Sequence, residues 1–172
     1  MKKVVSFDLD GTMCFTPEPE DGKKVYKKVT GQEWPYSGWW GRKESIDLDI
    51  FPIPVNPLVY SDYLKHQSDN ETYIILATGR LDKLQNEVQK ILDYNNLDFD
   101  EVHCNPGADT YIFKTKLFEK LIQQHRPEVF TMYDDRHEHL VKFGEWAKTQ
   151  PCQIDIIDVV NKTHKIFNGS LI

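Results

Sequence analysis

The chain has 172 residues, of which 40% are hydrophobic and 28% charged, and its formal net charge is −6. This length suits one domain with one core, and the composition is that of an ordinary globular protein. No apolar run is long enough to cross a bilayer, so we expect no membrane partner. The negative charge argues against broad, charge-driven binding to nucleic acid, but it leaves room for a local basic pocket around one phosphate.

The cysteines and the N-terminal run bear on the compartment. Cys14, Cys104 and Cys152 are odd in number, widely scattered and form no C-x-x-C pair. Reduced thiols fit this spacing better than a disulfide framework. The first apolar run carries aspartates, so it is not the core of a signal peptide. We therefore expect a cytoplasmic protein.

Apolar runs that alternate with amphipathic stretches predict the elements in chain order. The first strand is expected over 4–9, and a helix is expected near Pro57–Gln67. Further strands are expected over 73–77, 101–104, 129–133 and 154–160, and helical stripes recur over 84–92, 113–123 and 140–147. Strands that alternate with helices indicate an α/β fold, with a parallel sheet of about five strands and helices on both faces.

The region 13–72 breaks this alternation. It holds most of the prolines and all but one of the tryptophans, including Trp39 and Trp40. A structureless loop of this length is improbable in a compact domain. We therefore expect a single domain over 1–172 with an inserted cap or lid at about 13–72, whose aromatic residues mainly pack the lid onto the domain.

The end of the first strand carries two acidic residues, Asp8 and Asp10, followed by Gly11 and Thr12. In a strand, residues two positions apart point to the same side, so both carboxylates are expected to face one small volume. Two carboxylates that close will not both stay ionised without a compensating cation. A divalent metal meets that need, and a carboxylate beside a metal can act as a nucleophile. The alternative is a solvated acidic strand end.

Thr78-Gly79-Arg80 directly follows the second expected strand, where open α/β sheets place their sites. A hydroxyl can bond a phosphate oxygen, glycine lets the backbone approach closely, and the arginine fork suits phosphate oxygens. The alternative is an ordinary turn between a strand and a helix.

Two further features follow later strands. Lys114 begins an expected helix, where a cation is unusual unless it reaches an anionic site. Asp134 and Asp135, followed by Arg136, end the fourth apolar run and offer the hard oxygen ligands that suit Mg²⁺. The alternatives are a solvated lysine and an N-cap formed by Asp135.

With these four elements in order, the sequence resembles the haloacid dehalogenase superfamily of phosphohydrolases. The first motif corresponds to 8–12, the second to Thr78, the third to Lys114 and the fourth to Asp134 and Asp135. The resemblance implies a Rossmann-like sheet with a small cap inserted after the first strand. It also implies an aspartyl-phosphate mechanism with Asp8 as nucleophile and Asp10 as general acid and base.

The resemblance assigns the remaining site residues as well. Thr78 and Lys114 would hold the phosphoryl oxygens, and Mg²⁺ would be bound by Asp8, the main-chain carbonyl of Asp10, and Asp134 or Asp135. The candidate substrate-binding residues are Thr12, Gly79, Arg80 and Arg136, although Thr12 is favoured as support for the acidic loop. Arg80 and Arg136 are the candidates to grip a second phosphate or a nucleic-acid backbone.

A narrower resemblance links the chain to the Swiss Army Knife RNA-repair branch of that superfamily. It rests on Phe15-Thr16-Pro17, Trp39-Trp40, Ala77-Thr78-Gly79-Arg80, Thr110-x-x-Phe113-Lys114 and Tyr133-Asp134-Asp135-Arg136-x-x-His139. The resemblance implies a Mg²⁺-dependent phosphatase that acts on RNA or DNA ends. The alternatives are a 5′(3′)-nucleotidase that acts on free nucleotides and, in another class, a binding module that has the same scaffold without turnover.

Overall fold

The computed structural model describes the backbone of residues 1–160 and 163–167 and the side chains of residues 1–159. Six strands form one sheet in the order β3-β2-β1-β4-β5-β6. The strands are β1 (Lys3–Phe7), β2 (Thr72–Leu81), β3 (Glu101–Asn105), β4 (Val129–Asp134), β5 (Gln153–Val160) and β6 (Thr163–Phe167). The first five run parallel, which confirms the predicted sheet. The sixth was not predicted; it pairs antiparallel to β5 and extends that edge.

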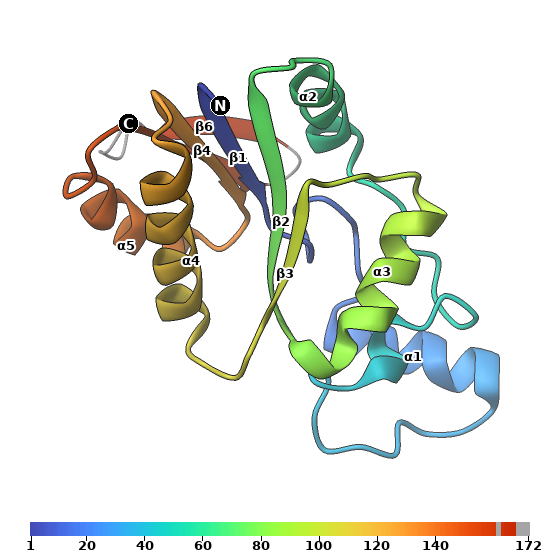
Figure 1. The fold of residues 1–172 in the computed structure, drawn as a ribbon. Coiled ribbons are helices and arrows are strands. Elements are labelled where there is room, and N and C mark those ends of the chain that lie inside the picture. Colours follow the sequence, from blue (N-terminus) through green and yellow to red (C-terminus); the bar gives the residue numbers. More distant parts are fainter. Residues whose placement is uncertain (161–162, 168–172) are drawn as a thin grey trace.

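Helices cover both faces of the sheet, as predicted (Figure 1). One face carries α2 (Pro57–Gln67) and α3 (Gln85–Tyr94), and the other carries α4 (Thr110–His125) and α5 (His137–Ala147). Successive residues of β1 serve opposite faces. Phe7 packs with Tyr63 of α2 in one buried cluster, whereas Val4 shares the other cluster with Phe118 of α4. Strand β1 is therefore buried on both sides, as its continuous apolar sequence requires.

The chain between β1 and β2 holds two kinds of structure. The first part contains α1 (Pro19–Thr30) and the short 3-10 helix η1 (Lys43–Ile46), and its Trp39 donates a hydrogen bond to the carbonyl of Pro17 at 3.1 Å. The second part is α2, whose Tyr63 hydroxyl donates to the carbonyl of Asp98 at 2.9 Å. We name residues 13–56 the insert, since α2 is the crossover helix of the sheet. The division into one domain over 1–172 with an inserted segment at 13–72 stays a prediction.

Local signals explain where the helices next to the insert and the site begin. Asn56 caps α2 by accepting from the main-chain N–H of Leu58, and Pro57 occupies the first turn, where its missing N–H costs nothing. Asp109 caps α4 by accepting from the N–H of Ile112. The helix thus begins before residue 113, and Lys114 lies in its second turn instead of at its start. Among the described residues, no helix is long and apolar enough to span a membrane.

Candidate active site

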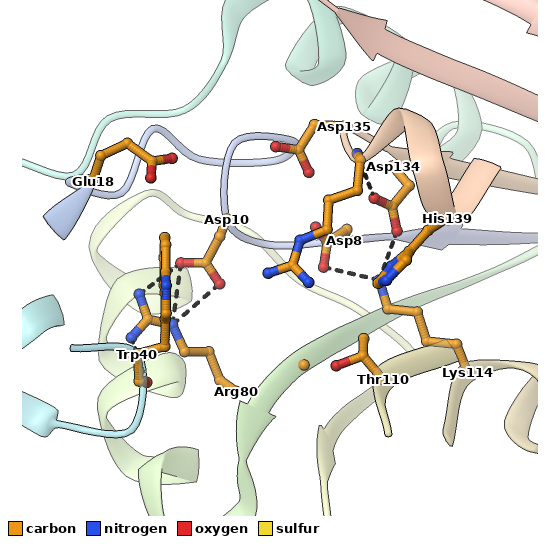
Figure 2. A pocket seen from close by; sticks show the side chains of 12 residues that line it. Asp8, Asp10, Glu18, Trp40, Arg80, Thr110, Lys114, Asp134, Asp135 and His139 are labelled. Atoms are coloured by element: carbon orange, nitrogen blue, oxygen red, sulfur yellow. Dashed lines mark hydrogen bonds and ion pairs between the residues drawn. The ribbon is translucent and has the colours of Figure 1, made fainter. Parts of the chain in front are cut away.

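A cavity of about 430 Å³ opens where β1, β2 and β4 end, which is where parallel α/β sheets place their sites (Figure 2). Of the residues predicted from sequence, the structure brings eight to its wall: Asp8, Asp10, Gly79, Arg80, Lys114, Asp134, Asp135 and Arg136. The wall also includes Glu18, Trp40, Thr110 and His139. Residues far apart in the chain therefore meet around one space.

Lys114 joins two of the carboxylates. Its Nζ lies 3.0 Å from Oδ1 of Asp8 and 2.9 Å from Oδ2 of Asp134, and all three side chains are almost fully buried. Asp135 completes an acidic cluster, because one oxygen from each of Asp8, Asp134 and Asp135 lies within 4.8 Å of the others. Three carboxylates face one ammonium group, so the cluster carries an excess of two negative charges when all of them are ionised.

The pKa values reflect this crowding. Burial raises the pKa of Asp8 well above its usual range; Lys114 opposes this shift and the other carboxylates reinforce it. Burial and the charge of Asp134 raise the pKa of Asp135 to about 6. Burial alone would lower the pKa of Lys114, but Asp134 and Asp8 outweigh it and raise that pKa, so the ammonium stays charged. Burial likewise opposes ionisation of Asp134, but Lys114 reverses the effect and its pKa is lowered.

The side chain of Asp10 lies apart from this cluster. Strand β1 ends at Phe7 and the chain turns at Gly11 with a φ of 69°, so Asp8 and Asp10 do not share one side of a strand. Both still line one cavity, as expected. Arg80 Nη2 donates to Oδ1 of Asp10 at 2.7 Å, and Nε lies 3.1 Å from both oxygens. The hydroxyl of Thr16 donates to the same Oδ1 at 2.6 Å. The two aspartates thus meet different cations.

Arg80 is in turn fixed by the insert. Its Nη1 donates to the carbonyl of Trp40 at 2.8 Å and to the hydroxyl of Ser45 at 2.7 Å. Its guanidinium also lies 4.9 Å from the centre of the Trp40 ring. The side chain is 1% exposed, and most of its N–H groups point to protein acceptors. This geometry favours a role in holding Asp10, whereas a direct grip on a nucleic-acid backbone stays a prediction for Arg80 and Arg136.

The end of β4 and the loop after it place the second acidic pair. Asp134 Oδ1 accepts from the main-chain N–H of Arg136 at 3.0 Å, which leads the chain into α5. Asp135 does not cap that helix, because the N-cap is Arg136 and no side chain fills the capping role. Instead, the carboxylate of Asp135 lies against Gly11, in the space that a Cβ would occupy. Only glycine leaves room for this contact between the two acidic loops.

Thr12 and Thr78 do not reach the cavity wall. Both are fully buried, and the hydroxyl of Thr78 accepts from the N–H of Arg80 at 3.1 Å. Thr12 is thus placed to support the loop that carries Asp8 and Asp10, and Thr78 to support the end of β2. Their expected contacts with substrate stay predictions. Gly79 does line the cavity, and a Cβ there would lie 2.9 Å from Oγ1 of Thr110, which explains a glycine at this close approach.

Sequence reasoning missed several residues of the site. Ser45 carried no signal, because a hydroxyl in the insert acquires meaning only when Arg80 folds against it. Nothing in the sequence marked Glu18 or the main-chain carbonyl of Trp40 as part of the site. Thr110 and His139 appeared within the quoted branch pattern and received no role in the predicted site. Among the described residues, the buried Nδ1 of His139 has no hydrogen-bond partner. Cys14, although near in sequence, is buried, and burial raises its pKa to about 12, so its thiol stays protonated.

Comparison with solved structures supports the fold. A chain from the structure of the Pnkp1/Rnl/Hen1 RNA repair complex matches 90% of this chain and 42% of its own length, with a TM-score of 0.56 and 20% sequence identity. This chain thus spans less than half of that neighbour, and the likeness is one of fold. No curated protein sequence matches the chain.

The fold and the acidic cavity define a haloacid dehalogenase-type domain, as the sequence motifs implied. A family model matches residues 22–168. The chain belongs to the family described as HAD domain family 1 in Swiss Army Knife RNA repair proteins. This confirms the resemblance drawn from the motifs, and Asp8 and Asp10 lie before the matched region.

Proposed function

We propose that the chain is a Mg²⁺-dependent phosphohydrolase that removes a terminal phosphate from a polynucleotide through an aspartyl-phosphate intermediate. One observation carries the proposal. Asp8 lies in a cavity with Lys114, Asp134 and Asp135, whereas Asp10, in the same cavity, is paired with Arg80. A nucleophile and an acid/base group with different electrostatic partners are what a two-step phosphoryl transfer needs. The family's association with RNA repair supports a polynucleotide substrate.

The residues present fit a magnesium ion. The oxygen atoms of Asp8, Asp134 and Asp135 are hard ligands, and Mg²⁺ commonly uses few carboxylates and keeps several waters. A divalent cation would also cancel the excess of two negative charges that Lys114 leaves. The side chain of Asp10 is turned to Arg80, so only its main-chain carbonyl would remain for the metal. When bound, Mg²⁺ would neutralise phosphoryl oxygens and keep Asp8 ionised.

Asp8 performs the first step in this proposal. Its carboxylate oxygen attacks phosphorus, an acyl–phosphate bond forms, and the bond from phosphorus to the leaving oxygen breaks. Asp10 gives its proton to that oxygen. In the second step Asp10 takes a proton from water, the water oxygen attacks phosphorus, and the bond to Asp8 breaks to release inorganic phosphate. Lys114 offsets the negative charge around Asp8 throughout, and such neutralisation supplies most of the rate in phosphoryl transfer.

Hydrogen bonding distinguishes the two oxygens of Asp10. Oδ1 accepts from Thr16 and from both Nε and Nη2 of Arg80, whereas Oδ2 accepts only from Nε. The less engaged Oδ2 is therefore the oxygen that we assign to proton transfer. Thr16 and Arg80 hold the carboxylate of Asp10 in one orientation at the cavity wall.

Phosphate release from a 3′-phosphorylated oligonucleotide tests the proposal. We expect turnover with Mg²⁺, none with EDTA, and a loss of about 10³-fold or more in Asp8→Asn, because the amide cannot act as the nucleophile. Asp93→Asn, an exposed aspartate on α3, is the matched control and should keep full activity. Persistent turnover in Asp8→Asn would contradict the mechanism.

The same assay separates substrate classes. Nucleoside monophosphates and a small aryl phosphate are compared with the oligonucleotide at equal phosphate concentration. Preference for the monophosphates would assign the chain to the nucleotidases. Failure of the wild-type chain to release phosphate from any ester would reject the enzymatic proposal and favour a binding module.

A further inference from the structure

One of the smaller cavities lies where the insert meets the segment after β2. It measures about 240 Å³, and the lining residues that matter here are Tyr36, Gly41, Arg42, Lys43, Glu44 and Lys83. We name it the insert groove. Trp40 lines the active-site cavity and Gly41 lines the insert groove, so neighbouring residues in the chain border both spaces.

The boundary between the two cavities is rigidly held. The carbonyl of Trp40 accepts from Arg80 at 2.8 Å, and the N–H of Arg42 donates to the carbonyl of Trp39 at 3.0 Å. The hydroxyl of Ser45 donates to the carbonyl of Arg42 at 2.6 Å. Hydrogen bonds thus hold the backbone between the two cavities at Trp40 and at Arg42. A ligand that spans both cavities would meet a preformed surface.

The insert groove is locally basic in a chain of net charge −6. Arg42, Lys43 and Lys83 line it, and no carboxylate of the described residues lies within ion-pair distance of them. The one carboxylate in the wall, Glu44, accepts a hydrogen bond from the hydroxyl of Tyr36 at 2.9 Å. Three cations around one small cavity therefore favour an anionic group, for which the arginine fork and the lysine ammonium are common phosphate ligands.

Aromatic rings accompany these cations. The guanidinium of Arg42 lies 4.6 Å from the centre of the Tyr36 ring, which fixes it at the groove. Trp40, 36% exposed as a residue, lines the active-site cavity. Figure 2 shows this ring beside Arg80, at the side of the cavity away from Lys114. Surfaces that alternate cations with exposed aromatic rings bind single-stranded nucleic acid, because each ring can stack a base while the cations hold the backbone.

We propose that the insert groove binds the phosphodiester next to the end of a single-stranded polynucleotide. The terminal phosphate lies in the active-site cavity, the terminal nucleoside rests against Trp40, and the following phosphate is held by Arg42 and Lys83. This inference rests on the proposed phosphatase function and adds the path by which the strand leaves the site. Arg80 was the sequence-based candidate for contacts with the nucleic-acid backbone, but its donors serve Asp10 and the insert. The inference assigns those contacts to Arg42 and Lys83 instead.

The lysines of α1 are the competing basic surface. Lys23, Lys24, Lys27 and Lys28 are exposed on that helix. Lys27 pairs with Glu33 at 2.6 Å, and Glu20 and Asp21 occupy the first turn of the same helix. The acidic residues partly compensate the charge of these lysines. None of the four lines the active-site cavity or the insert groove, so they offer no shaped site for a phosphate.

The test compares two substrates in the intact chain: a 3′-phosphorylated oligonucleotide and a small aryl phosphate. We expect Lys83→Ala and Arg42→Gln each to raise KM for the oligonucleotide about 5- to 20-fold, and each to reduce the slope of log KM against log salt by about 1. Turnover of the aryl phosphate should not change, because neither residue lines the active-site cavity. Lys120→Ala, an exposed lysine on α4 on the opposite face of the sheet, is the matched control.

Each outcome decides the proposal separately from the phosphatase function. An unchanged KM for the oligonucleotide overturns the groove while the hydrolysis stands, and so does an effect of Lys24→Ala in place of Lys83→Ala. Equal losses on both substrates also overturn it, because they would mean damage to the active-site cavity. If the wild-type chain hydrolyses no ester, fluorescence anisotropy of the labelled oligonucleotide with Asp8→Asn decides: weaker binding after Lys83→Ala supports the groove, and equal binding rejects it.

Discussion

Arg80 grips Asp10 with Nη2 2.7 Å from Oδ1 and with Nε 3.1 Å from each carboxylate oxygen. A planar fork holds a carboxylate in one orientation, which an ammonium group cannot do. Since Asp10 is the proposed proton donor, its orientation relative to the leaving oxygen should matter more for turnover than for binding.

We therefore expect Arg80→Lys to lower kcat about 10- to 100-fold while KM for an aryl phosphate changes little. Leaving groups of low pKa need no proton, so the loss should shrink for an aryl phosphate with a good leaving group. Steady-state kinetics over a leaving-group series measures this. Ser45→Ala, which removes the 2.7 Å contact to Nη1, should give a smaller loss in the same direction. A loss that is independent of the leaving group would contradict the role in proton transfer.

The acidic cluster predicts how stability depends on pH when metal is removed. Burial raises the pKa of Asp135 from 3.8 to about 6 in the folded chain. A raised carboxyl pKa stabilises the fold at low pH, and that contribution is lost as pH rises from the unfolded value through about 6. In EDTA, the Tm of Asp135→Asn should therefore rise relative to wild type between pH 5 and pH 7.5, because the amide does not ionise.

Magnesium should act in the opposite direction. Metal ligands must be deprotonated, so the increase in Tm that Mg²⁺ gives the wild-type chain should be larger at pH 7.5 than at pH 5. Thermal unfolding at both pH values, with Mg²⁺ and with EDTA, measures both effects. The same increase at the two pH values, or in Asp135→Asn, would argue against Asp135 as a ligand.

Gly11 predicts a link between backbone conformation and the metal cluster. Its φ is +69°, and a Cβ would enter the space of the Asp135 carboxylate. Gly11→Ala should destabilise the chain by about 1–2 kcal/mol through the left-handed backbone alone, and should also weaken Mg²⁺ binding by displacing Asp135. Gly31→Ala is the control, since its φ is +76° with nothing within 4 Å of a Cβ. It should share the loss of stability and bind Mg²⁺ normally; equal Mg²⁺ affinity in both variants would disprove the link.

Two helical glycines make a matched pair for the packing of the insert. A Cβ on Gly22 of α1 would collide with the ring of Trp39, whereas a Cβ on Gly144 of α5 would meet open space. Urea unfolding should show Gly22→Ala destabilised by about 1–3 kcal/mol, because the buried ring has to move. Gly144→Ala should be neutral or stabilised by up to about 1 kcal/mol, since alanine favours the helix. Equal changes in the free energy of unfolding for the two variants would mean that the Trp39 ring moves aside at no cost.

The fold was predictable because its signals are local. Continuous apolar runs marked the parallel strands, and the helix Pro57–Gln67 was expected within the bounds that the structure gives it. The end of β1 was misjudged, since Leu9 continues the apolar run but lies beyond Phe7, the last residue of the strand. Asp8 and Asp10 therefore meet different partners. Strand β6 was missed because an antiparallel edge strand lies outside the alternation of strands and helices.

The sequence predicted most of the residues that form the site but not which of them contact one another. Acidic residues after apolar runs named Asp8, Asp10, Asp134 and Asp135, and the structure brings all four to one cavity. Which cation each one meets depends on contacts between residues up to 106 positions apart, as for Lys114 and Asp8. No sequence spacing encodes such distances, so the association of Asp10 with Arg80, and of Arg80 with Ser45, could be found only in three dimensions.

Nη1 of Arg80 donates to two acceptors in the insert, the Trp40 carbonyl and the Ser45 hydroxyl, and both should limit how the insert of this chain can be replaced. A cap that only walled the cavity could be exchanged for another loop without affecting the chemistry beneath it. Here, a replacement segment would have to return both oxygen atoms to the same positions, or the arginine would lose its hold on the acid. If the chain has the proposed activity, side-chain substitutions within the existing insert should therefore change its selectivity at less cost to turnover than a grafted cap would.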